Sequence, residues 1–358
     1  MSDAPVEVEP LPGSASATTP SIGRRILPKL LVSLVLGALF AWLVARGGVP
    51  LVPPSSAFAD VVWWTIPAYV VVLFATTWVR ASRWRFLVAP IKPVPIREVI
   101  GLNWIGFFAI FVMPLRLGEL ARPALSKMRE GIPISVGFGT VAVERVLDGL
   151  VTSLCVAFAV FALPHLDTDD QLARHVPTYG MLALVLFTGA FVALACFLWQ
   201  RRLATALVER TVGLVSRRLA SLLATKIDGV AEGVRSIGDA RLGLAFLVET
   251  LAYWALNALG MWLLAWGCGL SMSFGHAVAI MGILAIGILL PAGPGLFGNF
   301  QLAVMAALKL YFPEDVVATH GAVYIFLLYG IQAVFICLAG IVPLYAMKIR
   351  FGDLVSAR

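Results

Sequence analysis

The sequence predicts an all-α protein, a polytopic membrane helix bundle with two re-entrant broken-helix hairpins in an inverted-topology repeat. Hydrophobic residues form 60% of the chain and charged residues 13%, whereas a soluble domain carries about 25% charged residues. Residues 250–308 contain no Asp, Glu, Lys or Arg, and this run is about three times as long as one spanning helix requires. Pro and Gly interrupt it at 291–298. Irregular backbone at membrane depth must find hydrogen-bond partners, so this break is expected to be buried in protein or to line a cavity.

Charge and cysteine content argue against several other classes of protein. The formal charge of +7 does not indicate a nucleic-acid partner, because the Lys and Arg residues of membrane proteins gather in cytoplasmic loops beside anionic lipids. The four cysteines lie in apolar runs and only four histidines accompany them, so no metal site and no cofactor are predicted. Residues 1–23 are rich in Pro, Ser, Ala and Thr, which predicts a disordered tail before a single transmembrane domain at 24–358.

The apolar runs place the first elements in order. The run 30–45 follows three basic residues, and this flank predicts a cytoplasmic N-terminus. The run 61–79 is expected to return across the membrane. Residues 98–128 are interrupted at Pro114 and have basic residues at both ends. This segment is therefore predicted to be a hairpin that enters the membrane from the cytoplasm and leaves on the same side.

The rest of the chain is expected to contain four more spans, a surface helix and a second hairpin that enters from the outside. Residues 134–163 cross outward and 178–199 return. Residues 200–239 carry apolar side chains at helical spacing between basic ones, which predicts an amphipathic helix on the cytoplasmic surface. The remaining elements are an outward span, a hairpin from outside and a returning span, at 242–268, 276–308 and 321–347.

Two units of this predicted topology contain the same elements in the same order. Residues 61–163 and 242–347 each contain a span, a broken hairpin and a span, offset by about 180 residues and opposite in direction. Inverted repeats with paired broken helices are typical of transporters that bind substrate near the bilayer midplane. All but six of the 27 Lys and Arg residues fall on the proposed cytoplasmic side. This bias predicts a multi-pass protein of the cell (inner) membrane with both termini in the cytoplasm.

A first charged cluster follows the first break. Arg116, Glu119 and Arg122 recur at helical spacing after Pro114, and Asn103 precedes the break. These charges could be interfacial side chains that reach the cytoplasm. However, they follow an interrupted helix rather than a helix end, which favours a substrate-binding site.

A second cluster, Glu144, Arg145 and Asp148, lies within the following span. Ionisable groups at such depth are rare unless they pair with one another or face water. Two interpretations stay open: ion pairs that hold the fold, with Asp148 opposite Arg116 or Arg122, and contact with substrate. The charged residues of the two clusters are predicted to form one connected polar network.

The second break carries Pro291, Gly293, Gly295, Gly298 and Gln301. Its glycines supply bare backbone amides and permit close approach, and a helix that restarts there points its N-terminus at the midplane. Together with the arginines of the first cluster, such helix ends would suit a phosphate. The sequence has no G-x-S-x-G, H-E-x-x-H or Walker pattern, so neither catalysis nor ATP hydrolysis is predicted.

These motifs together resemble a known family. They run in the order Pro114-x-Arg-x-Gly-Glu119, Gly131-Ile-Pro133, Val143-Glu-Arg-Val-Leu-Asp148 and Pro291-Ala-Gly-Pro-Gly-x-x-Gly-x-x-Gln301. This order is similar to the lysylphosphatidylglycerol synthase transmembrane region, also called the flippase-like or UPF0104 family. The resemblance spans about 28–347 and implies movement of an anionic lipid or a lipid-linked sugar between leaflets. Larger members carry a soluble aminoacyl-transferase domain after the membrane part, and only eleven residues follow Met347 here, so that transferase activity is not expected.

The predicted function is therefore flippase-like translocation of an anionic phospholipid or lipid-linked sugar. Its predicted partners are membrane phospholipids or polyprenyl-phosphate lipids. Moving a charged headgroup through hydrocarbon is prohibitive without polar partners, and a groove between broken helices would supply them. Two alternatives stay open: a secondary transporter of a small anionic solute, with a sealed cavity, and a membrane-embedded lipid transferase.

Overall fold

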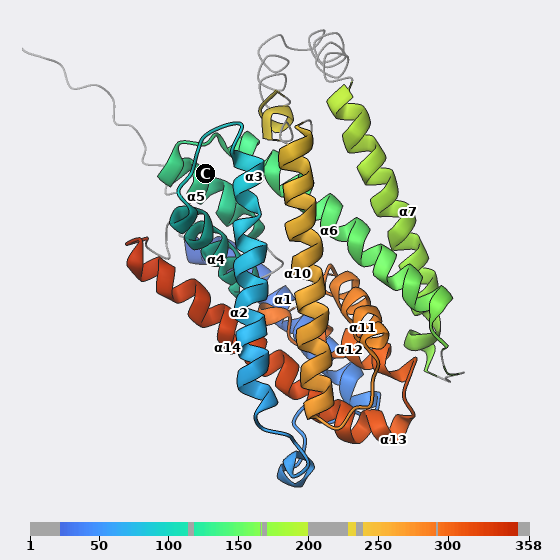
Figure 1. The fold of residues 1–358 in the computed structure, drawn as a ribbon. Coiled ribbons are helices and arrows are strands. Elements are labelled where there is room, and N and C mark those ends of the chain that lie inside the picture. The colour runs from blue at the N-terminus through green and yellow to red at the C-terminus, as the bar shows by residue number, and fades with distance from the viewer. Residues whose placement is uncertain are drawn as a thin grey trace, which may run out of the picture.

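The computed structural model describes residues 22–113, 118–164, 166, 170–199, 228–233, 239–290 and 293–349. Every regular element within them is a helix (Figure 1), which confirms the all-α prediction. In chain order these elements are α1 (Ile22–Arg46), η1 (Ser55–Phe58), α2 (Thr65–Ser82), α3 (Trp84–Val88), α4 (Ile96–Val112), α5 (Ala121–Glu130), α6 (Ile134–Ala162), α7 (Gln171–Trp199), α10 (Ala240–Gly267), α11 (Phe274–Gly287), η5 (Pro294–Leu296), α12 (Asn299–Lys309), α13 (Glu314–Val316), η6 (Val317–Gly321) and α14 (Ala322–Ala346).

Helices of membrane-spanning length account for most of the described chain. Five segments of the described residues are long and apolar enough to cross: Thr65–Val88, Ile134–Ala162, Gln171–Ala193, Ala240–Gly267 and Glu314–Ala346. The apolar part of α1, Leu30–Arg46, is shorter. The protein is thus a multi-pass membrane protein. The predicted tail at 1–23 and amphipathic segment at 200–239 lie almost wholly outside the described residues, although 228–233 is helical.

One helix starts earlier than its apolar run predicts. α7 begins at Gln171 and passes through Pro177, because Asp170 caps it: the Asp170 carboxylate accepts hydrogen bonds from the backbone N–H groups of Leu172 and Ala173, both at 3.0 Å. Lys309 Nζ donates to the same carboxylate at 2.8 Å. Partial burial opposes ionisation, yet these donors hold the pKa of Asp170 below its ordinary value.

Each predicted hairpin is a pair of helices that pack against one another. α4 and α5 do so across the first break, residues 113–120, and α11 and α12 across the second break, residues 288–298. Figure 1 shows α4 and α5 toward one end of the long helices α2 and α10, and α11 and α12 toward the other end. That each pair re-enters the membrane, and from which side, stays a prediction.

The helix contacts are reciprocal between the two predicted units. α2 packs against α10, α6 packs against the α11 of the second hairpin, and α14 packs against the α4 of the first. Each unit thus covers the broken helices of the other with its final span, which is the arrangement that two units related by a two-fold axis produce. α7 lies against α6, and α1 lies against α12 and the second break.

The second break is closed by glycines that pack on α1. A Cβ on Gly37 would lie 3.2 Å from Gly293 Cα, and a Cβ on Gly298 would lie 2.8 Å from the backbone nitrogen of Ala41. Gly295 and Gly298 have φ of 73° and 82°, a region that favours glycine. The turn between them leaves the Gly295 carbonyl free to accept from Tyr329 Oη, at 3.1 Å.

Gly298→Ala is expected to destabilise the protein by at least about 1–2 kcal/mol, the cost of a left-handed conformation for a residue with a Cβ. Overlap with α1 adds to this cost. The measurement is the midpoint of thermal unfolding in detergent. Gly330→Ala is the matched control, because a Cβ there meets nothing within 4 Å and alanine favours a helix. An equal midpoint for both variants would contradict the close packing of α1 on the break.

Candidate functional site

A cavity of about 210 Å³ lies where the two units meet. Its walls come from α2, α4, α6, α7, α10, α11, α12, α14 and the second break. The lining is mostly apolar, and its aromatic members are Phe107, Phe111, Phe187, Tyr253, Trp254, Phe300 and Tyr329. The cavity is large enough for several water molecules or for a polar headgroup.

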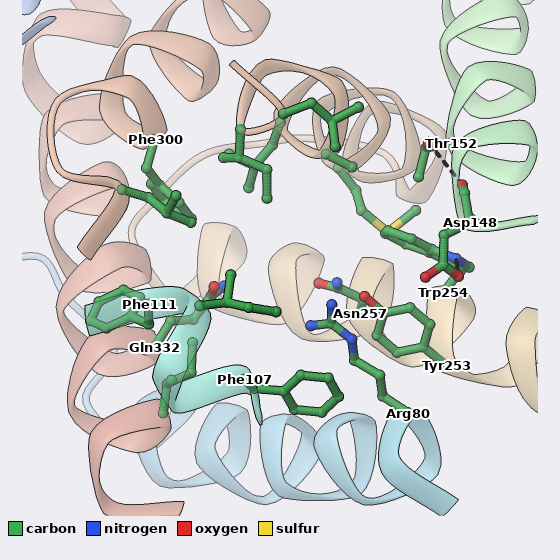
Figure 2. Close-up of a pocket in the computed structure, with 18 of the residues that line it drawn as sticks. Arg80, Phe107, Phe111, Asp148, Thr152, Tyr253, Trp254, Asn257, Phe300 and Gln332 are labelled. Carbon is green, nitrogen blue, oxygen red and sulfur yellow. Dashed lines mark hydrogen bonds between the residues drawn. The ribbon is translucent and has the colours of Figure 1, made fainter. Parts of the chain in front are cut away.

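Two arginines bring positive charge to this cavity. The Arg80 guanidinium lies 4.3 Å from the centroid of the Phe107 ring and 5.4 Å from that of Tyr253. Figure 2 shows Arg80 reaching past these rings toward Asn257. Arg145 lines the cavity from α6. The Nε atoms of both arginines are buried without a hydrogen-bond partner, and neither guanidinium forms an ion pair with another described residue.

A buried ion pair stands beside the cavity. Arg83, directly after α2, donates from Nη1 and Nη2 to the two carboxylate oxygens of Asp148, both at 2.7 Å. Nη1 also donates to Thr250 Oγ1 at 3.1 Å, and Trp254 Nε1 donates to Asp148 Oδ1 at 3.2 Å. Arg83 is only 1% exposed. These four residues, the Arg83 clamp, join α2, α6 and α10.

A second buried ion pair joins α4, α5 and α6. Arg122 donates from Nη1 to Asn103 Oδ1 at 2.6 Å and from Nη2 to Glu144 Oε2. We call these three residues the Arg122 clamp. Glu144 Oε1 is buried without a partner. A small cavity of about 10 Å³, with Glu119, Arg122 and Arg145 in its lining, is about large enough for one water molecule.

The clamps leave the large cavity with excess positive charge. Asp148 is the carboxylate that lines it, and both oxygens of this group already accept hydrogen bonds within the Arg83 clamp. Arg80 and Arg145 therefore have no ion-pair partner among the described residues, in surroundings that are mostly apolar, and a bound anion would offset the cost of their charge. Within the described part of the chain, no group of three or more His, Cys, Asp or Glu residues could hold a metal ion.

The structure divides the predicted charged network into two clamps. Glu144 and Asp148 lie one turn apart on α6, but their partners come from different helices. The predicted pairing of Asp148 with Arg122 is wrong: Asp148 pairs with Arg83, because α2 ends beside α6 and α10, whereas α5 brings Arg122 to Glu144. Arg116 lies outside the described residues.

Two other predicted residues line cavities. Arg145 takes part in neither clamp and faces both the large and the small cavity. Glu119 lines the small cavity together with Arg122 and Arg145. Asn103 is buried, and its side chain is fixed by a hydrogen bond from Nδ2 to the carbonyl one turn earlier, at 2.8 Å. Asn103 therefore positions Arg122 rather than lining a cavity.

The residues predicted at the second break mostly face away from the cavity. Gly293 and Gly298 pack on α1. Gln301 Oε1 accepts a hydrogen bond from the Gly298 N–H at 2.8 Å, so Gln301 caps α12. The break residues that line the cavity are Ile288, Leu289 and Leu296, none of which was among the predicted site residues. Pro291 lies outside the described residues.

Sequence reasoning missed Arg80, Arg83 and Trp254. Arg80, Arg83 and Arg85 follow the apolar run 61–79. Such a group of basic residues is typical of the cytoplasmic end of a membrane span, so it did not indicate a site. One signal could have separated them: apolar residues continue beyond these arginines, so that the apolar segment Thr65–Val88 contains them. A tryptophan within an apolar helix carries no signal of its own, since lipid-facing and cavity-facing rings look alike in a sequence.

Comparison with known proteins gives two matches. Residues 30–340 match the family model described as the lysylphosphatidylglycerol synthase TM region. A protein of Methanothermobacter thermautotrophicus described as a UPF0104 membrane protein is 26% identical over 264 residues, which cover 70% of this chain and 74% of that protein. No solved structure matches the chain.

Proposed function

We propose that this chain, which belongs to the lysylphosphatidylglycerol synthase TM region family, moves a lipid with an anionic, phosphate-bearing headgroup between leaflets. The observation that carries the proposal is the pair Arg80 and Arg145, which face a cavity between the two units without a carboxylate partner among the described residues. A guanidinium stacked between aromatic rings, as Arg80 is, keeps its N–H edge available. That edge matches the oxygens of a phosphate.

The headgroup and the hydrocarbon chains of the lipid would lie in different environments, the cavity and the bilayer. The headgroup would occupy the cavity while its acyl or polyprenyl chains stay in the bilayer, because only the headgroup needs polar partners. Rocking of one unit against the other would then expose the headgroup to each side in turn. The arginines lower the cost of carrying phosphate through hydrocarbon, a cost of several kcal/mol without polar partners.

The proposal also specifies the partners, the location and the chemistry of the protein. The partners are membrane phospholipids or polyprenyl-phosphate lipids, and no nucleic acid is involved. The protein lies in the cell membrane with both termini in the cytoplasm, as the distribution of Lys and Arg favours. It works without a cofactor and without catalytic activity of its own.

The test is a proteoliposome assay without nucleotide. The full chain is reconstituted with traces of fluorescent phosphatidylglycerol or fluorescent polyprenyl phosphate, and an impermeant quencher is added outside. Protein-free vesicles should lose only outer-leaflet label, whereas vesicles with protein should lose inner-leaflet label as well. A parallel arm follows radiolabelled phosphate. Uptake of phosphate, with every lipid at the protein-free rate, would contradict the proposal and favour a small-anion transporter.

A further inference from the structure

We infer that the headgroup this cavity selects is a sugar ring joined to a phosphate, rather than a glycerol phosphate or an aminoacylated phosphate. This inference rests on the proposed function and narrows it to one substrate class. It combines an aromatic wall of fixed geometry, two side-chain amides and the absence of an available carboxylate among the described lining residues.

The aromatic wall lies on α10. Tyr253 and Trp254 both line the cavity, with ring centroids 4.5 Å apart and planes at 52°. Trp254 is 8% exposed, and its indole N–H is held by Asp148, which is itself held at both oxygens by Arg83. A ring fixed in this way gives a preorganised surface. Its electron-rich face attracts the polarised C–H groups of a sugar, which a glycerol headgroup does not present as a flat face.

The amides suit the hydroxyl groups of a sugar. Asn257 stands one turn after Tyr253 on α10, lines the cavity, and makes no hydrogen bond to another described residue. Gln332 lines it from α14 and donates from Nε2 to Tyr69 Oη at 2.9 Å, which leaves its carbonyl oxygen to accept. An amide both donates and accepts, as a hydroxyl does. Figure 2 shows Asn257 and Gln332 on the same side of the cavity as Arg80.

The charge of the lining disfavours an amine. Arg80 and Arg145 repel a cationic headgroup, and the carboxylate of Asp148 is already bound by Arg83 and Trp254. A lysyl or ethanolamine group would therefore enter a positive cavity without a counter-charge. A sugar phosphate instead places its anionic part on the arginines and its uncharged ring on the aromatic wall.

The experiment compares initial rates in proteoliposomes for four fluorescent lipids that separate the possible sources. These are a polyprenyl-phosphate hexose, phosphatidylinositol, whose cyclitol ring presents a polyol face similar to that of a sugar, phosphatidylglycerol and lysylphosphatidylglycerol. The first two should move about three- to tenfold faster than phosphatidylglycerol, which corresponds to one aromatic stacking contact, and lysylphosphatidylglycerol should be slowest. If the polyprenyl-phosphate hexose moves no faster than phosphatidylglycerol, the sugar inference is overturned.

Variants assign the preference to the aromatic wall. Trp254→Leu should remove the preference for sugar lipids, and Trp254→Phe should restore most of it. Trp266→Leu is the control, because Trp266 lies on the same helix and is 50% exposed. If Trp254→Leu does not fold, Asn257→Ala gives the second measurement, and it should also reduce the preference.

The outcomes separate the two proposals. No movement of any lipid would contradict the proposed function. Movement of all anionic lipids at one rate, or equal loss for all of them in Trp254→Leu and Asn257→Ala, would overturn the sugar inference and leave the function standing. Fastest movement of lysylphosphatidylglycerol would overturn the inference as well.

Discussion

Arg83→Ala is expected to remove most of the folded protein from the membrane. Without Arg83, the buried Asp148 carboxylate keeps a single side-chain donor among the described residues, Trp254, and Arg80 and Arg145, which line the same cavity, form no ion pair with it. Removing one partner of a buried pair costs about 3–5 kcal/mol, which is a large share of a stability of about 5–15 kcal/mol. The measurement is the yield of monodisperse protein in detergent together with its midpoint of thermal unfolding.

Two further variants make this result specific. Arg85→Ala should change little, because Arg85 is 43% exposed in its pair with Glu249, and such pairs contribute about 0–1 kcal/mol. Replacing Arg83 and Asp148 together with leucine should recover part of the loss, since no unpaired charge is then left in the interior. A normal yield and midpoint for Arg83→Ala would show that the Arg83 clamp does not hold the fold.

Arg80→Gln and Arg145→Gln are expected to lower lipid movement and to leave the folded yield unchanged. Neither arginine has a carboxylate partner among the described residues, so its removal leaves no buried anion behind. A hydrogen bond to a charged group contributes about 1.5–3 kcal/mol, which predicts a loss of rate of roughly tenfold to more than a hundredfold for each variant. The measurement is the proteoliposome rate at equal protein content.

Two control variants separate the effect of the positive charge from the effect of its position in the cavity. Arg145→Lys should retain part of the rate, because the charge survives although the planar fork is lost. Arg129→Gln should retain all of it, since Arg129 is 35% exposed and pairs with Glu98 outside the cavity. Wild-type rates in Arg80→Gln, in Arg145→Gln and in the variant with both changes would show that these arginines do not contact the moving group.

Much of the fold could be predicted because hydropathy reports directly on membrane insertion. The spans 134–163 and 242–268 agree closely with α6 and α10, since runs of that length and composition have one stable environment. The breaks could be placed because Pro and Gly interrupt helices locally. α7 was placed too late because a capping carboxylate, Asp170, extends it beyond its apolar run.

The pairing of charges could not be predicted, because it depends on which helix ends meet in space. The sequence identifies Glu144 and Asp148 as embedded carboxylates, yet nothing in it shows that one faces α5 and the other the end of α2. The same holds for the second break. Its glycines signal a close approach, but the partner in that approach is α1 rather than a ligand.

The residues of the Arg83 clamp leave the ribosome at different times during synthesis. Asp148 follows Arg83 by 65 residues and Thr250 follows it by 167. At about 5–20 residues per second, these partners leave the ribosome roughly 3–13 s and 8–33 s after Arg83. Throughout that delay the guanidinium lacks its native partner Asp148, and water and lipid phosphates at the bilayer surface are available to solvate it. α2 therefore reaches its final depth only when α6 and then α10 arrive, and assembly of the first unit is completed by the second.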